Sequence, residues 1–147
     1  MLAKAALVAI AATSLIAARS AAPTAKSFIV PLTPTAEASE PQALGLAGDA
    51  DASGTVRLTV DPQNRQICYD FSVDHVATPL MAHIHRGSQR DTGPSVVTLF
   101  TGPGDLHDCL TWTEKWLAAI VADPSNFYVN LYTTEYPDGA LRGQLLG

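Results

Sequence analysis

The chain has 147 residues, enough for one domain with a hydrophobic core, and it is acidic, with nine basic against fourteen acidic residues. No cluster of basic residues offsets this surplus, which argues against nucleic acid and anionic lipid as partners.

The first segment has the composition of a secretory signal peptide. Lys4 precedes an unbroken run of apolar and small residues from Ala5 to Ala18, and Ala18 and Ser20 suit a cleavage site after Ser20. A membrane anchor is the alternative, but the run is shorter than the roughly 20 residues that span a bilayer. We therefore expect residues 1–22 to hold a cleaved signal peptide and the mature chain to be secreted or periplasmic, with no membrane span. The mature chain keeps seven basic and all fourteen acidic residues, a net charge of −7.

Both cysteines, Cys68 and Cys109, lie in the mature part of the chain. In an oxidising compartment an even pair most simply forms one disulfide. It would close a loop of about 40 residues and contribute about 4 kcal/mol in the chain-entropy description. A reactive thiol is the alternative, which the absence of a Cys-x-x-Cys pair disfavours.

The mature sequence alternates short apolar-polar strand patterns with turn signals. We expect seven strands, or eight if 109–113 is extended. The seven cover 27–32, 54–60, 67–74, 81–85, 95–100, 127–134 and 140–146. Residues 33–41 are expected to form a loop, and turns at 61–64 and 136–139 predict two β-hairpins. One short helix is predicted over 114–122, with Thr113 as its N-cap and Pro124 after its end. This pattern predicts an all-β sandwich or barrel with one short helix and no internal repeat.

The period of two also sorts side chains into faces. Ile84 is expected to face the core and its two histidine neighbours to face outward. We expect one outer face, or sheet end, to carry His83, His85, Asn130, Tyr132, Arg142 and Gln144. If the histidine strand lies beside the last hairpin, these six form one polar patch, although the outer face of any antiparallel sheet is polar. We expect Arg142 to orient its sheet neighbours or to pair with Glu135 or Asp138, and Trp112 and Trp116 to pack against the sandwich.

Three features of the sequence resemble the CHRD domain, a family named for chordin. They are AHIHRG at 82–87 followed by Gly93-Pro94, the segment YVNLYTTEYPDGALRGQL at 128–145, and Cys-Tyr-Asp at 68–70. The resemblance covers residues 27–146 and implies a Greek-key, immunoglobulin-like β-sandwich similar in architecture to Cu,Zn superoxide dismutase. In chordin such domains are extracellular modules of a protein that binds signalling ligands. For an exported bacterial single-domain member, the resemblance implies a binding or scaffolding role and no established reaction.

The sequence departs from the family at one position that bears on metal binding. The usual Asn-Val-His-Thr is Asn130-Leu131-Tyr132-Thr133 here, so Tyr132 replaces a recurrent histidine. A tight zinc or copper site generally needs three or four ligands. Copper or zinc binding by His83 and His85, with Tyr132 or His107, therefore remains an alternative function.

Enzymatic functions have less support from the sequence. A dismutase-like copper centre would need several histidines around one metal, and the chain has only four: His75, His83, His85 and His107. No Gly-x-Ser-x-Gly motif or paired carboxylates point to a hydrolase. The sequence thus favours a binding or scaffolding module whose partner is an unknown extracellular or periplasmic protein or ligand, with no assigned catalytic residue.

Overall fold

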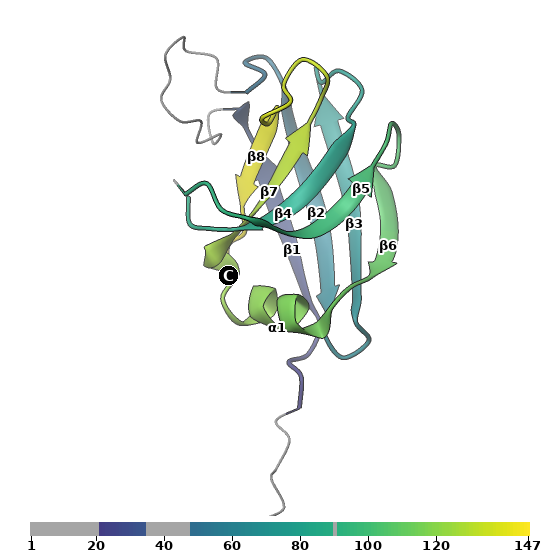
Figure 1. Ribbon diagram of the computed structural model, residues 1–147, viewed down its shortest axis with the longest axis vertical. Helices are drawn as coiled ribbons and strands as arrows, with labels where there is room; N and C mark the ends of the chain where they lie inside the picture. The colour runs from purple at the N-terminus through teal and green to yellow at the C-terminus, as the bar shows by residue number, and fades with distance from the viewer. Residues whose placement is uncertain (1–20, 35–47, 90) are drawn as a thin grey trace, which may run out of the picture.

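The computed structural model describes residues 21–34, 48–89 and 91–147, which fold into two four-stranded antiparallel sheets packed face to face (Figure 1). Residues 1–20 of the expected signal peptide and most of the expected 33–41 loop lie outside the described residues. The elements, in chain order, are β1 (Lys26–Leu32), β2 (Ser53–Asp61), β3 (Gln66–Asp74), β4 (Met81–Arg86), β5 (Ser95–Thr101), β6 (His107–Thr111), α1 (Glu114–Ala122), the 3-10 helix η2 (Pro124–Asn126), β7 (Phe127–Tyr132) and β8 (Leu141–Gln144).

One sheet has the strand order β1-β2-β3-β6 and the other β5-β4-β7-β8. The chain crosses from the first sheet to the second between β3 and β4, back between β5 and β6, and across again through α1 to β7. Strand β7 thereby returns to pair with β4, which gives the connections Greek-key character. The expected all-β sandwich is confirmed, and the topology places the histidine strand β4 directly beside the last hairpin.

Most of the local expectations are confirmed. The β2–β3 and β7–β8 hairpins form, and the helix begins and ends where the sequence predicts. Thr113 occupies the N-cap position, but its side chain makes no capping hydrogen bond. The eighth strand is β6, which begins at His107, two residues earlier than expected, because it pairs with β3 from Asp70 to Gln66.

Alternation along the strands builds the core between the sheets. Val56 and Leu58 of β2 face Ile84 of β4 and Leu131 of β7 across the interface, all nearly inaccessible to solvent. Helix α1 lies at one end of the sandwich (Figure 1) and buries Leu117 and Ile120 there. Burial of these apolar side chains, at roughly 25 cal/mol per Å², is what holds the two sheets together.

The two tryptophans near α1 pack against the core as expected. The Trp112 indole N–H donates to the Val96 carbonyl at 2.8 Å. Among the described residues, no helix is long and apolar enough to cross a membrane.

The expected disulfide is present. Cys68 of β3 and Cys109 of β6 are directly opposite each other in the strand register and are joined by a bond that spans 41 positions of sequence. It fastens the edge strand β6 to its sheet. A disulfide of this kind is typical of extracellular domains.

Candidate functional site

Strands β4, β7 and β8 together present the six residues that the sequence places on one polar face. The register aligns His83, Asn130 and Arg142 in one row across the three strands. In the next row on the same face, His85 lies opposite Tyr128, and Tyr128 lies opposite Gln144. Because side chains two positions apart on a strand share a face, both rows and Tyr132 belong to one surface of the sheet.

The sequence predicts that this face points outward, but three of its residues are nearly inaccessible to solvent. Asn130 is 5% exposed, Tyr132 8% and Arg142 only 2%. The described part of the connection between β4 and β5, residues 87–89 and 91–94 and here called the β4–β5 loop, lies against the sheet, where Arg142 bonds to two of its carbonyls. The three residues share the expected face, but all three are buried there, and the β4–β5 loop covers Arg142.

Arg142 is the residue that holds the β4–β5 loop. Its Nη1 donates to the Asp91 carbonyl at 3.0 Å and its Nη2 donates to the Ser88 carbonyl at 2.9 Å. The guanidinium carbon lies 3.3 Å from the centre of the Tyr128 ring, in cation–π contact. Of the two roles expected for Arg142, the contact with Tyr128 on the neighbouring strand agrees with orienting its sheet neighbours, whereas its Nη1 and Nη2 bond to carbonyls of this loop and not to Glu135 or Asp138.

The loop also has internal support. The Asp91 carboxylate accepts hydrogen bonds from the Ser88 N–H at 2.9 Å and the Ser88 hydroxyl at 2.7 Å. These bonds, and the nearby Arg142 charge, lower the pKa of Asp91. The charged carboxylate is therefore the form that closes the turn.

The structure explains why residue 93 of the loop is a glycine. A Cβ at this position would lie 1.6 Å from the Arg86 carbonyl oxygen, so only glycine permits the close approach. The Gly93 N–H donates to the Tyr128 hydroxyl at 3.0 Å, and its carbonyl accepts from His85. Gly93 thus joins the loop to two rings of the face.

Both ring nitrogens of His85 are hydrogen-bonded. Nδ1 lies 2.8 Å from the Gly93 carbonyl, which can only accept, so Nδ1 carries the proton. Nε2, 2.8 Å from the Tyr132 hydroxyl, then accepts from Tyr132 in the neutral imidazole. Burial lowers the pKa of His85, the bond to Gly93 opposes this, and Arg142 lowers it further. His85 also stacks on Tyr128, with ring centroids 5.0 Å apart and planes 9° apart.

His83 is half-buried and lies beside both His85 and Tyr132. Its ring centroid is 5.8 Å from that of His85 and 5.5 Å from that of Tyr132. Burial, and then the neighbouring His85, lower its pKa. The two imidazoles and the phenol form a compact cluster beside the β4–β5 loop.

The other two histidines lie away from this cluster. His107 is in β6, in the opposite sheet, paired with Asp70. His75 follows β3 and contacts Asp74, with its side chain 68% exposed. Within the ranges that the structure describes, no three side chains of the metal-binding types His, Cys, Asp or Glu gather at one point. Two imidazoles and one phenol do not fit a tight, dismutase-like metal centre.

Sequence reasoning missed two parts of the site. Tyr128 alternates with the predicted residues and lies under both Arg142 and His85, but it was not among the candidates. The β4–β5 loop was expected only as a connection, and its Gly-Pro pair was the one signal of a constrained backbone there.

Comparison with known proteins identifies the family of this chain. A search of curated proteins and a search of solved structures found no match to the chain. The CHRD domain matches residues 28–145, which include every strand from β2 to β8 and the AHIHRG and C-terminal motifs described above. The chain therefore belongs to the CHRD domain family.

Proposed function

We propose that this chain is a non-enzymatic binding or scaffolding module that contacts a protein partner through its β4–β5 loop. The contact surface consists of His83 and the exposed loop residues Ser88, Asp91 and Thr92, and is called the loop surface below. The observation that carries the proposal is the use of Arg142. The fully buried Arg142 guanidinium bonds to two backbone carbonyls of one loop, and this holds the exposed residues Ser88, Asp91 and Thr92 in a fixed place on the surface. Binding residues are commonly carried on loops that a rigid scaffold positions in this way.

The same arrangement argues for binding over catalysis. The polar groups gathered beneath the loop, which are Arg142, His85 and the Tyr128 hydroxyl, all bond to the loop's own backbone. Groups used in this way fix a conformation and are not arranged around a substrate position. The proposal therefore assigns no catalytic residue.

We further propose that the chain is exported by the signal peptide expected at 1–22, as a bacterial single-domain member of the family. The disulfide and the CHRD domain, both typical of extracellular proteins, support this. N-terminal sequencing of the protein recovered outside the cytoplasm tests it. A new N-terminus between residues 19 and 25 is the expected result, and an intact Met1 would contradict it.

The loop surface is tested by comparing variants in one quantitative capture experiment. Immobilised protein is incubated with exported proteins from its own cells, and bound proteins are quantified by mass spectrometry. The double variant His83→Ala/Thr92→Ala removes side chains from the loop surface. The control Arg57→Ala/Ser72→Ala removes two exposed side chains from the outer face of the opposite sheet.

The proposal expects a partner that the wild type and the control retain and the loop variant loses by at least about tenfold, a loss of roughly 1.4 kcal/mol. The partner is then purified and its affinity measured directly. A set of bound proteins that is the same for all three forms would refute the loop surface.

One observation favours weak zinc or copper binding as a second function. His85 donates its Nδ1–H to the Gly93 carbonyl, which is the arrangement that orients metal-binding histidines through their other nitrogen. Nε2 of His85 and the ring of His83 would then supply two ligands, with Tyr132 beside them. Titration calorimetry with Zn²⁺ and Cu²⁺ tests this function. Stoichiometric binding that His83→Ala abolishes is the expected result, and binding unaffected by this substitution would exclude the site.

A further inference from the structure

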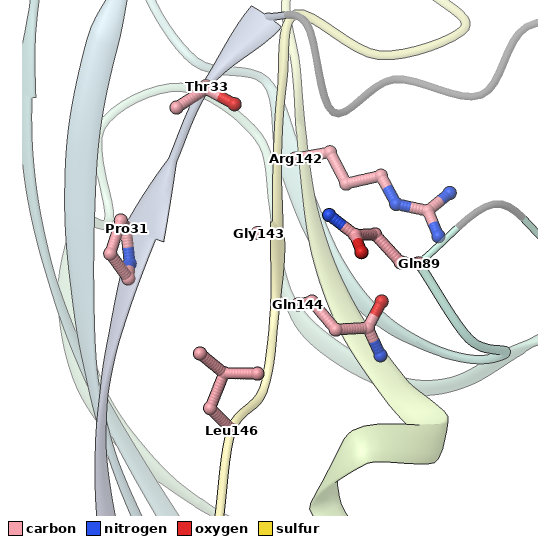
Figure 2. A pocket seen from close by; sticks show the side chains of 7 residues that line it. All are labelled: Pro31, Thr33, Gln89, Arg142, Gly143, Gln144 and Leu146. Carbon is pink, nitrogen blue, oxygen red and sulfur yellow. The ribbon is translucent and has the colours of Figure 1, made fainter.

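A pocket of about 420 Å³ lies where the edge strands of the two sheets meet, between β1, β8 and the β4–β5 loop (Figure 2). It is lined by Pro31, Thr33, Gln89, Arg142, Gly143, Gln144 and Leu146. It is separate from the loop surface, and neither His83 nor Thr92 lines it. None of the functions proposed above uses it.

The backbone explains why a pocket forms at this seam. Thr33 and Arg142 exchange two backbone hydrogen bonds, of 2.9 and 3.1 Å, that join β1 to β8. The next such pair in an antiparallel ladder would be Pro31 and Gln144, two residues further along each strand. Pro31 has no N–H to donate, so it cannot complete that pair. Gly143 keeps the strands close, since a Cβ there would lie 2.3 Å from the Pro31 carbonyl oxygen.

The orientation of Gln144 is fixed by its neighbours. Its Nε2 lies within hydrogen-bond distance of three carbonyls, those of Gly87 at 3.1 Å, Ser125 at 2.7 Å and Phe127 at 2.7 Å. The amide oxygen Oε1 must therefore point the other way, and Figure 2 shows it on the side of the pocket where Gln89 and Arg142 lie. Oε1 is buried and has no hydrogen-bond partner among the described residues. A buried acceptor without a hydrogen-bond partner favours a ligand that supplies a hydrogen-bond donor.

The remaining walls indicate an uncharged ligand. Among the described residues no acidic side chain lines the pocket, and the one charged lining side chain, Arg142, is already bonded to two loop carbonyls and stacked on Tyr128. Pro31 and the 69%-exposed Leu146 supply apolar surface. Gln89, on the exposed loop, can both donate and accept. The Gln89 side chain must turn outward before a ligand can reach Gln144 Oε1.

We propose that this pocket binds a neutral, hydroxyl-rich ligand, namely one or two units of a saccharide. A ligand hydroxyl donates to Gln144 Oε1, other hydroxyls bond to the Gln89 amide, and a C–H face of the sugar packs on Pro31 and Leu146. The pocket is at the small end of the range for ligand sites, which suits a saccharide unit better than a larger molecule.

The test is a nuclear magnetic resonance titration of the folded protein with neutral disaccharides: cellobiose, lactose, maltose and N,N′-diacetylchitobiose. Acetate and inorganic phosphate serve as anionic probes. The expected result is saturable change in the amide signals of Gly143, Gln144 and Leu146 with at least one disaccharide. Deoxy analogues of that sugar then identify the donating hydroxyl, whose loss should weaken binding about fivefold.

Variants locate the site without disturbing the carbonyl contacts of Gln144. Leu146→Ser and Gln89→Ala should each weaken saccharide binding by about fivefold. Ile29→Ser is the matched control, since Ile29 is also on the surface at 68% exposure and does not line the pocket, and it should have no effect. The proposal is overturned if no neutral saccharide gives saturable change, if only the anions bind, or if saccharide binding survives both pocket variants. The effect of Leu146→Ser is independent of the capture experiment, because Leu146 lies outside the β4–β5 loop and leaves the loop surface intact.

Discussion

Replacing Arg142 by methionine tests whether a buried guanidinium holds the β4–β5 loop on the sheet. Methionine keeps most of the apolar stem and removes the two hydrogen bonds to the Ser88 and Asp91 carbonyls. A hydrogen bond to a charged group contributes about 1.5–3 kcal/mol. The substitution also removes the free-energy cost of desolvating the buried guanidinium, which offsets part of this loss. We therefore expect Arg142→Met to lower the free energy of unfolding by about 3 kcal/mol.

Two measurements on the oxidised protein check this value and its origin. Urea unfolding gives the change in free energy from the shift in midpoint. Amide hydrogen exchange should show faster exchange at Gly87, Asp91 and Gly93, whose N–H groups are all hydrogen-bonded in the folded loop region. Arg57→Met, on the exposed outer face of the opposite sheet, should change stability by less than about 0.5 kcal/mol. If Arg142→Met is equally neutral and exchange in the loop is unchanged, Arg142 does not hold the loop.

Three further predictions concern the residues under the loop. Gly93→Ala should destabilise the protein by more than about 2 kcal/mol in the same urea assay, because its Cβ would meet the Arg86 carbonyl at 1.6 Å; a neutral effect would mean that the loop moves away without cost. Burial lowers the pKa of His83 and His85 in the folded state, so the unfolded chain binds more protons as the pH falls. Their contribution to stability should be complete above the ordinary histidine pKa of about 6.5 and should decrease as the pH falls through that value toward the lower folded-state pKa values. Unfolding at pH 7.5 and 5 measures this decrease, which His85→Asn should reduce; an unchanged or opposite dependence would contradict it. Tyr132→His, which restores the family's usual residue, should raise zinc affinity at least about tenfold by calorimetry, by adding a third imidazole; equal affinity would show that the three positions do not converge on a metal.

Much of the fold is predictable from the sequence because its signals are local. Apolar-polar alternation sets which side of each strand is buried, and the turn residues at 61–64 and 136–139 fix both hairpins. The helix limits follow from Thr113 and Pro124. The same alternation places His83, His85 and Arg142 on one face, because strand periodicity needs no knowledge of neighbouring strands.

The environment of that face depends on contacts between distant parts of the chain. Alternation predicts that Arg142 points away from the core, but not that a loop 51 to 54 positions earlier in the sequence covers it. Glu135 and Asp138 are expected as partners because they are near Arg142 in sequence. The carbonyls of Ser88 and Asp91 reach Arg142 because β4, which precedes their loop, and β8 lie in the same sheet. The pocket at the seam likewise exists only because Pro31 and Gln144, on different sheets, come together.

The sequence by itself thus determined the two-faced strands from residue alternation, the disulfide from an even pair of cysteines in a chain expected to be exported, and the family from three short motifs. Only the tertiary structure decided that its polar face is a platform under a loop held by Arg142. The reason is physical: whether a polar side chain meets water or another segment depends on the packing of the whole chain, which no local pattern specifies.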